Sequence, residues 1–220
     1  MWLFLSKIQE EGAIFLNDTI GDISDILLKA DFALQTLTTE LNVLIKEYEF
    51  NNKVNPVEHI KTRIKTKESS ICKLKRKGYE PTRENLINHI HDLVGVRIVC
   101  SFLSDVYEIV KIIKNSNLYQ IKKEDDFIKH PKQSGYSSYH LNVWVPIHLN
   151  GKVEMVEAEI QIRTMAMDFW ASLEHKIRYK FEGEIPEEVE KELFGVSGEV
   201  KDLDSKMFNL NELMKKYNEE

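Results

Sequence analysis

The sequence has few cysteines and no long apolar run. Cys72 and Cys100 are the only cysteines in 220 residues, and they have neither metal-ligand nor redox-motif spacing, which is typical of a reduced cytosolic protein. The segment Met1–Lys7 contains a short apolar run without a preceding basic stretch, so we expect neither a signal peptide nor a membrane span there. A helix packed against the fold is the expected structure of this segment. We therefore expect a cytoplasmic protein that is not inserted in a membrane.

The net charge is also small, and it is unevenly distributed. The formal net charge is −6, and residues 184–220 carry all of it, with eleven acidic and five basic side chains. The first 183 residues are therefore neutral overall, yet Lys61–Lys77 contains eight lysines or arginines and one acidic residue, Glu68. A local basic cluster in a neutral domain favours a phosphate-bearing ligand over general nucleic-acid binding.

The clearest secondary-structure pattern is the alternation of polar and apolar residues in Val153–Arg163. The last seven residues alternate strictly, which predicts a β-strand with a core face and a polar face. The polar face carries Glu157, Glu159, Gln161 and Arg163, and the apolar face carries Val156, Ala158, Ile160 and Ile162. Such a polar face is usually only solvated, but the neighbouring residues favour a functional site here.

A hairpin is expected to bring further functional groups beside this strand. Asn150-Gly151 is a strong two-residue hairpin signal, so the preceding strand, Tyr139–Ile147, should pair with it in antiparallel fashion. Glu159 is then expected close to the start of that preceding strand, which carries Tyr139 and His140. This arrangement joins a carboxylate, an aromatic ring and an imidazole in one candidate site.

The basic segment and the residues that follow it supply a second group of candidates. Ser69, Lys73 and Arg76 are spaced so that a helix would present them on one face, which suits a polyphosphate. The alternative is a basic helix that is merely solvated. Asp92 directly precedes Val94–Val99, an apolar β-branched run typical of a buried strand, and could bind a metal or cap a turn.

Heptad-like spacing predicts helices at both ends of the chain. In 23–48 and in 187–220, apolar residues recur in alternating steps of four and three. Gly195 and Gly198 leave open whether the tail forms one helix or two. A seam this long must be covered by the N-terminal helix or by another subunit, so we expect a homo-oligomer. A further helix is expected over Thr164–Phe181, with its first residue as the N-cap.

Five short motifs occur in order along the chain. They are Arg63-x-Lys65 with Ser69 and Lys73, then Asp92-Leu-Val-Gly-Val-Arg97, then Ser134-Gly-Tyr136 through Tyr139-His140, then Glu159-Ile-Gln-Ile-Arg-Thr164, and finally Glu174-His175. In this order they resemble the synthetase domain of the RelA/SpoT-homologue superfamily, and most closely the RelQ-like small alarmone synthetases. The resemblance covers about residues 40–183. It implies a nucleotidyltransferase-like α+β fold, with a mixed, mostly antiparallel sheet flanked by helices.

The resemblance also implies three regions and one reaction. Residues 1–50 are expected to form an N-terminal helical region, residues 51–183 the synthetase domain, and residues 184–220 a helical oligomerisation tail. The implied reaction moves the β,γ-pyrophosphate of ATP to the 3′-hydroxyl of GDP or GTP. The products are AMP and ppGpp or pppGpp, the alarmones of the stringent response. We expect synthesis alone, because the chain leaves no room for the hydrolase domain of long family members.

The motif positions imply a role for each candidate residue. Asp92 would hold Mg²⁺, while Glu159 would accept the 3′-hydroxyl proton or share the metal. Arg63 and Arg97 would stack on adenine. The implied ATP-phosphate ligands are Lys65, Ser69, Lys73 and Arg76. The implied GDP/GTP ligands are Lys132, Tyr136, His140, Gln161 and Asp168, with the tyrosine stacked on guanine.

Two residues depart from the family pattern. Ser137 stands where close relatives usually have Arg, and Asp168 where they often have Asn. These departures keep two alternatives open: a relative that modifies another acceptor such as tRNA, and a nucleotide- or RNA-binding sensor without catalysis. The resemblance further implies a homotetramer that (p)ppGpp or single-stranded RNA could regulate.

Overall fold

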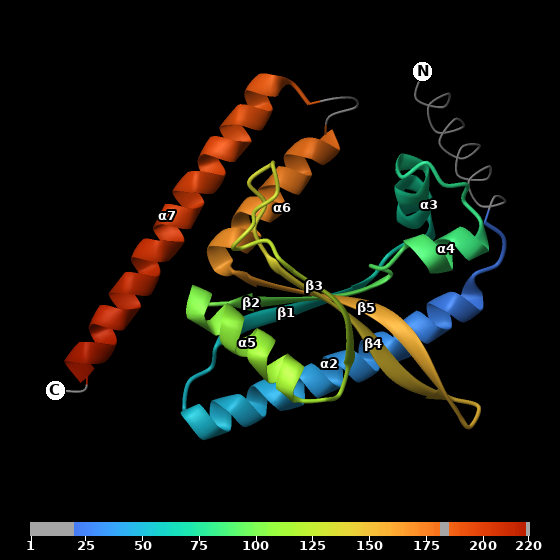
Figure 1. Cartoon of the computed structure of the whole chain (residues 1–220), viewed down its shortest axis with the longest axis horizontal. Helices are drawn as coiled ribbons and strands as arrows, with labels where there is room; N and C mark the ends of the chain where they lie inside the picture. Colours follow the sequence, from blue (N-terminus) through green and yellow to red (C-terminus); the bar gives the residue numbers. More distant parts are fainter. Residues whose placement is uncertain (1–19, 181–184, 219–220) are drawn as a thin grey trace, which may run out of the picture.

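The computed structural model describes residues 20–180 and 185–218, which contain a five-stranded sheet with helices on both sides (Figure 1). The helices are α2 (Ser24–Asn52), α3 (Lys67–Arg76), α4 (Arg83–His89), α5 (Leu103–Asn115), α6 (Met165–Lys180) and α7 (Glu187–Asn218). The strands are β1 (Val57–Ile64), β2 (Val94–Cys100), β3 (Gln120–Asp126), β4 (Tyr139–Leu149) and β5 (Lys152–Thr164). The segment 1–7, for which a helix is expected, lies outside the described residues. Within the described ranges, no helix combines the length and the apolar character that crossing a bilayer requires.

The sheet is mixed and mostly antiparallel, as predicted. Its order is β1-β2-β5-β4-β3, and of the four described strand pairs only β2 and β5 are parallel. β4 and β5 form the predicted hairpin, whose turn residues Asn150 and Gly151 have φ values of 52° and 73°. Positive φ at both positions is what a type I′ turn requires. The register places His140 opposite Gln161, two residues along β5 from Glu159, which pairs with Asn142. Tyr139, the aromatic residue expected in the same site, is instead buried in the hydrophobic core.

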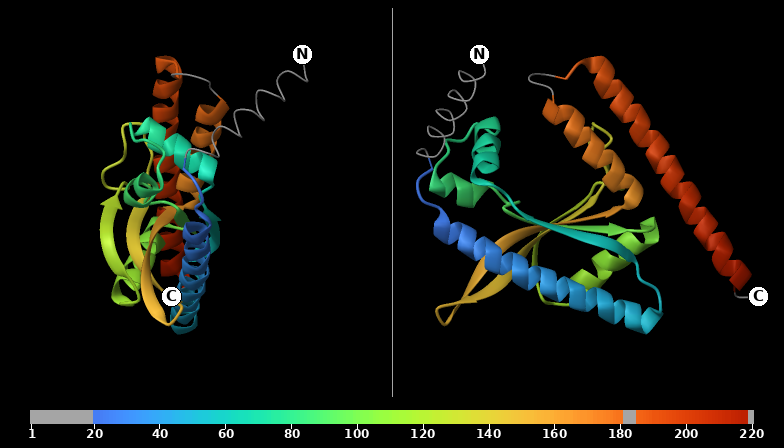
Figure 2. Two further views of the ribbon diagram at one scale, coloured as in Figure 1. Left: turned by 90° about the vertical axis from the view of Figure 1, so that its right-hand side faces the viewer. Right: turned by 180° about the vertical axis from the view of Figure 1, so that it is seen from behind.

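The two faces of the sheet have different roles. Helices α2 and α5 cover one face (Figure 1, Figure 2). The core on that face is built from alternate residues of the three central strands: Val94, Val96, Ile98, Leu141, Val143, Val145, Ala158, Ile160 and Ile162. The intervening residues point to the opposite face, which α3 and α4 flank on one side and α6 on the other. Glu159 and Gln161 therefore lie on this second face.

Two elements differ from, or add to, what the sequence predicts. The helix expected in the basic segment is confirmed for Lys67–Arg76, but the strand β1 precedes it. β1 is an edge strand whose side chains are mostly polar and exposed, so it lacks the alternation that identifies a half-buried strand. The tail forms one continuous helix, α7, which neither Gly195 nor Gly198 interrupts. Thr164 is confirmed as the cap of α6, because its hydroxyl oxygen accepts a hydrogen bond from the backbone amide of Met167 at 3.2 Å.

We predict that Ile160→Ala lowers the free energy of unfolding by about 2–5 kcal/mol, because this side chain is completely buried between the sheet and its covering helices. Val153→Ala on the same strand is the control. Val153 is 60% exposed, so its truncation should change stability by less than about 0.5 kcal/mol. Urea unfolding measures both values, and equal effects of the two substitutions would contradict the assignment of the faces of β5.

Candidate active site

The candidate site lies at the centre of the polar face of the sheet. Gly95 of β2 lies between Arg63 of β1 and Glu159 of β5, and two residues further along, Arg97 lies between Lys61 and Gln161. These residues from three adjacent strands line one pocket with a volume of about 250 Å³. The parallel pairing of β2 and β5 thus brings cationic and acidic side chains, which are far apart in sequence, to one place.

Gly95 has a specific part in forming this pocket. A Cβ atom at this position would lie 3.4 Å from both Cγ and Nε of Arg63, at the short end of ordinary van der Waals contact. The Arg63 side chain therefore lies directly against the backbone of the neighbouring strand. Arg97, which also lines the pocket, is half-buried on the same strand as Gly95. Two planar guanidinium groups consequently flank the space above the sheet.

Glu159 is held by hydrogen bonds on both carboxylate oxygens. The Nδ1 atom of His140 lies 3.3 Å from Oε1, and the side-chain amide of Gln161 donates to Oε2 at 2.6 Å. Burial alone would raise the pKa of Glu159, but the hydrogen bonds and charge of His140 and the bond from Gln161 outweigh it, so the pKa lies below its usual value. The carboxylate is therefore ionised at neutral pH, as an acceptor of a proton must be.

The hydrogen bonds to Glu159 continue through a chain of aromatic and cationic groups. The other ring nitrogen of His140, Nε2, lies 2.8 Å from the Tyr136 hydroxyl oxygen, so these two side chains share a hydrogen bond. The Tyr136 oxygen in turn accepts a hydrogen bond from Arg163, which also donates to the side-chain oxygen of Gln161 at 2.9 Å. Glu159 is thus positioned by a closed set of contacts between β4, β5 and the loop before β4.

Asp92 is the second carboxylate of the site, and two lysines hold it. The Lys65 ammonium lies 3.1 Å from Oδ2, and the Lys73 ammonium lies 2.9 Å from Oδ1. Burial alone would raise the pKa of Asp92, but the hydrogen bonds and charges of the two lysines outweigh it and the pKa lies below its usual value. The negative charge of Asp92 acts in the opposite direction on Glu159, because it tends to raise the pKa of that carboxyl.

The pair of carboxylates fits a magnesium ion that a nucleotide helps to hold. Among the described residues, no group of three or more histidine, cysteine, aspartate or glutamate side chains could hold a metal by itself. Mg²⁺ does not need such a group, because it usually binds one or two carboxylates together with phosphate oxygens and water. Asp92 and Glu159 provide that number of carboxylates, beside lysines that can bind phosphates.

Asp168, in the first turn of α6, is buried, and its carboxylate forms ion pairs with three basic side chains. Its Oδ1 atom lies 3.0 Å from Arg97 and 3.3 Å from Arg163, and its Oδ2 atom lies 3.6 Å from Lys61. The side chain therefore links the guanidinium beside the pocket to the guanidinium that supports Tyr136. The role implied for Asp168, recognition of guanine, would add to these contacts.

The loop between β3 and β4 brings Lys132 and Tyr136 together. The backbone amide of Lys132 donates to the carbonyl of Tyr136 at 3.1 Å, and the Lys132 ammonium lies 4.9 Å from the centre of the Tyr136 ring. The guanidinium of Arg163 lies 5.0 Å from the same centre. Cations over an aromatic ring are stabilised by its quadrupole, so this part of the site can present both an aromatic surface and positive charge.

Three residues that the sequence marks, two predicted ATP-phosphate ligands and one departure from the family pattern, make none of the contacts described so far. Ser69 is exposed on α3, where its hydroxyl oxygen accepts a hydrogen bond from Thr66. Arg76 is exposed near the end of α3 and makes none of the contacts described above. Ser137 lines a different pocket, next to α7. Lys61 and Arg163 also contact Asp168 in the site, although the motifs imply no role for them; the basic cluster and the alternation of β5 are the sequence signals that point to them.

The chain is similar to known proteins over most of its length. It matches the family described as "Region found in RelA / SpoT proteins" over residues 62–184. It is 45% identical over 195 residues to GTP pyrophosphokinase YwaC of Bacillus subtilis (strain 168). The aligned region covers 89% of this chain and 93% of that protein.

Solved structures show the same likeness in three dimensions. The crystal structure of small alarmone synthetase 2 from Bacillus subtilis is 44% identical, with a TM-score of 0.78, and covers 87% of this chain and 99% of that one. The structure of small alarmone synthetase 1 from the same organism, bound to its product pppGpp, is 32% identical, with a TM-score of 0.78. The match covers 86% of this chain and 95% of that one. The chain therefore belongs to the RelA/SpoT family and, within it, to the small alarmone synthetases.

Proposed function

We propose that the protein transfers the β,γ-pyrophosphoryl group of ATP to the 3′-hydroxyl of GDP or GTP, giving AMP and ppGpp or pppGpp. The observation that carries this proposal is the ionised Glu159 carboxylate beside an Asp92 that two lysines hold. The name of the similar Bacillus subtilis protein, GTP pyrophosphokinase, and the product pppGpp bound by the similar solved structure support it.

The chemical step needs a deprotonated 3′-oxygen aimed at phosphorus. In the proposed reaction this oxygen attacks the β-phosphorus of ATP, the bond between that phosphorus and the oxygen bridging to the α-phosphorus breaks, and AMP leaves. Glu159 accepts the hydroxyl proton. Because His140 and Gln161 hold both carboxylate oxygens, the base keeps its orientation during the reaction.

ATP is proposed to bind across β1, β2 and α3. Arg63 and Arg97 flank the pocket above Gly95, where their planar guanidinium groups can stack on adenine. Lys65 and Lys73 pair with Asp92 in the structure and would exchange this partner for phosphate oxygens. The exposed Ser69 and Arg76 extend the same basic helix. Mg²⁺, when bound by Asp92 and Glu159, would neutralise charge on the transferred group.

The acceptor nucleotide is proposed to bind beside the β3–β4 loop. Tyr136 offers its ring to guanine, and Lys132 and His140 supply groups for the phosphates. Asp168, which already forms ion pairs with Arg97 and Arg163, can accept hydrogen bonds from N1 and N2 of guanine through its carboxylate oxygens. Gln161, which contacts both Glu159 and Arg163, completes the set of predicted acceptor residues.

A direct assay separates this function from its alternatives. Purified protein with Mg²⁺ and with ATP labelled in the transferred group should convert GDP or GTP to labelled ppGpp or pppGpp. Label on tRNA would instead identify another acceptor, and RNA binding without turnover would identify a sensor. Absence of product with both guanine nucleotides would contradict the proposal.

We predict that Glu159→Gln lowers kcat by about 10²–10⁴-fold, because the amide cannot accept the hydroxyl proton. ATP affinity, measured by calorimetry without Mg²⁺, should change little, since the lysines and arginines remain. Glu157→Gln is the matched control: Glu157 lies on the same face of β5 but pairs with His91 at 2.9 Å and Lys122 at 2.8 Å. A comparable loss of kcat in both variants would show that Glu159 has no special role.

The predicted homotetramer is supported by apolar side chains that the single chain leaves exposed. On α6, Met165, Phe169, Leu173 and Ile177 follow one another at helical spacing with 40–60% exposure. On α7, the exposed apolar residues include Leu203, Met207, Leu210, Met214 and Tyr217. Stripes of this length usually mark protein–protein contacts.

The predicted regulators, (p)ppGpp and single-stranded RNA, stay predictions. We propose a cytoplasmic location because the substrates occur there and both cysteines are free thiols.

Replacing Phe169 and Leu173 together by Asp should reduce the assembly to smaller species, because charges would replace apolar contacts between subunits. Val153→Asp is the control, since Val153 is similarly exposed but lies on β5. Light scattering measures the mass of each protein. A wild-type protein that runs as a monomer would contradict the tetramer.

A further inference from the structure

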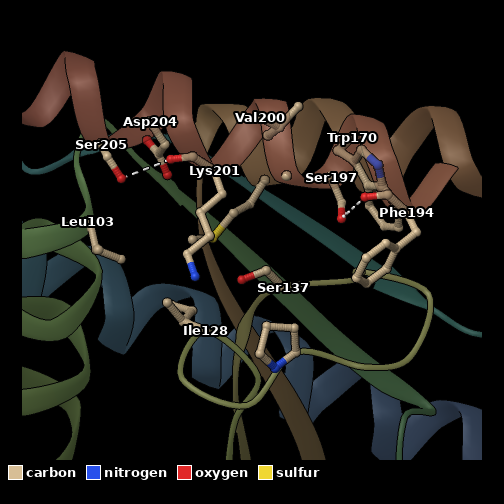
Figure 3. A pocket seen from close by; sticks show the side chains of 14 residues that line it. Leu103, Ile128, Ser137, Trp170, Phe194, Ser197, Val200, Lys201, Asp204 and Ser205 are labelled. Carbon is tan, nitrogen blue, oxygen red and sulfur yellow. Dashed lines mark hydrogen bonds between the residues drawn. The ribbon is translucent and has the colours of Figure 1, made fainter. Parts of the chain in front are cut away.

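A second pocket lies between the β3–β4 loop and helices α5, α6 and α7 (Figure 3). We call residues 127–137 the acceptor loop, because they carry Lys132 and Tyr136. The pocket has a volume of about 230 Å³. Its walls are mainly apolar and include Leu103, Ile128, Met167, Trp170, Phe194 and Val200. None of these residues belongs to the site described above.

The acceptor loop packs directly on α7 at the edge of this pocket. Gly135 has a φ of +86°, and a Cβ atom there would lie 2.1 Å from the Ser197 hydroxyl oxygen. The next residue, Tyr136, packs against the cluster formed by Trp170 and Leu193. The indole of Trp170 also donates to the Leu193 carbonyl at 3.1 Å. The same contacts therefore shape one wall of the pocket and the position of the acceptor tyrosine.

One positive charge faces the apolar walls. Figure 3 shows the Lys201 ammonium directed into the pocket toward Ser137. Among the described residues, no carboxylate forms an ion pair with it. The other charged residue of the wall, Asp204, accepts a hydrogen bond from the Thr164 hydroxyl at 2.7 Å. The pocket thus combines an apolar interior with a single available cation at its edge.

We propose that this pocket binds a small amphipathic anion, with an aliphatic or aromatic body among the apolar walls and a carboxylate on Lys201. Ligand sites are typically apolar cavities in which a few polar groups set orientation. The volume lies just below the ~300–1,000 Å³ of sites for drug-sized molecules, so the ligand is a smaller molecule. Lys201 gives the charge complementarity that selects an anion over a neutral molecule.

Occupancy of the pocket should be coupled to binding of the acceptor nucleotide. A ligand there adds contacts between the acceptor loop and α7, and so stabilises the loop position in which Tyr136 contacts His140. This coupling rests on the proposed function, whereas ligand binding itself does not. We expect the ligand to lower KM for GDP or GTP and to leave KM for ATP unchanged.

Two glycines of α7 provide a matched pair of variants. Gly198 lines the pocket and shares a helix face with Phe194, Lys201 and Ser205, and a Cβ there would meet no atom within 4 Å. Gly198→Leu should therefore fill the pocket without disturbing the helix. Gly195 is equally open but does not line the pocket, so Gly195→Leu is the control. Thermal unfolding checks that both variants fold.

The probe is ω-bromooctanoate, whose bromine quenches tryptophan fluorescence on contact. Saturable quenching is expected for the wild type and Gly195→Leu, because Trp170 forms part of the wall. Binding should weaken about tenfold or more in Gly198→Leu. Lys201→Met should weaken binding of the carboxylate but not of the neutral ω-bromooctanol. Unchanged quenching in Gly198→Leu would overturn the site, and equal loss of both probes in Lys201→Met would overturn the role of its charge.

Discussion

The geometry of the site depends on how the Glu159 carboxylate is held. An ionised carboxylate in a mostly buried position is stable only when hydrogen bonds and nearby cations offset its lost hydration. His140 and Gln161 provide the hydrogen bonds, and Tyr136 and Arg163 hold these two residues in turn. The proposed base is thereby linked to the loop that is proposed to hold the acceptor, so orientation of this carboxylate and binding of the acceptor would share one set of contacts.

The sheet separates an apolar environment on one face from a charged environment on the other, and Glu159 lies on the charged face. Alternate residues of β2, β4 and β5 bury their side chains under α2 and α5. The intervening residues collect the charged groups on the opposite face. Asp92, at the start of β2, joins them with Lys65 and Lys73, and Asp168 balances the arginines at the other side. Positive and negative groups therefore neutralise one another until nucleotides with their own charges bind.

Much of this site follows from local sequence patterns, and the remainder requires the tertiary structure. Alternation places Glu159 and Gln161 on one face of a strand, and Asn150-Gly151 fixes the hairpin that brings His140 to them. The strand β1 escapes notice because an exposed edge needs no apolar alternation. The burial of Arg163, which is 3% exposed, depends on Asp168 from α6 and on Tyr136 from the loop. No spacing within β5 alone reveals such contacts.

The central claim is that Glu159 acts on the 3′-hydroxyl of the acceptor while the basic residues near Asp92 hold the ATP phosphates. The most direct measurement is a crystal structure with GDP and a non-hydrolysable ATP analogue. We expect a Glu159 carboxylate oxygen within about 2.6–3.2 Å of the 3′-oxygen, and Lys65 and Lys73 moved from Asp92 to the phosphates. A 3′-hydroxyl directed away from Glu159, with both lysines still on Asp92, would contradict the account.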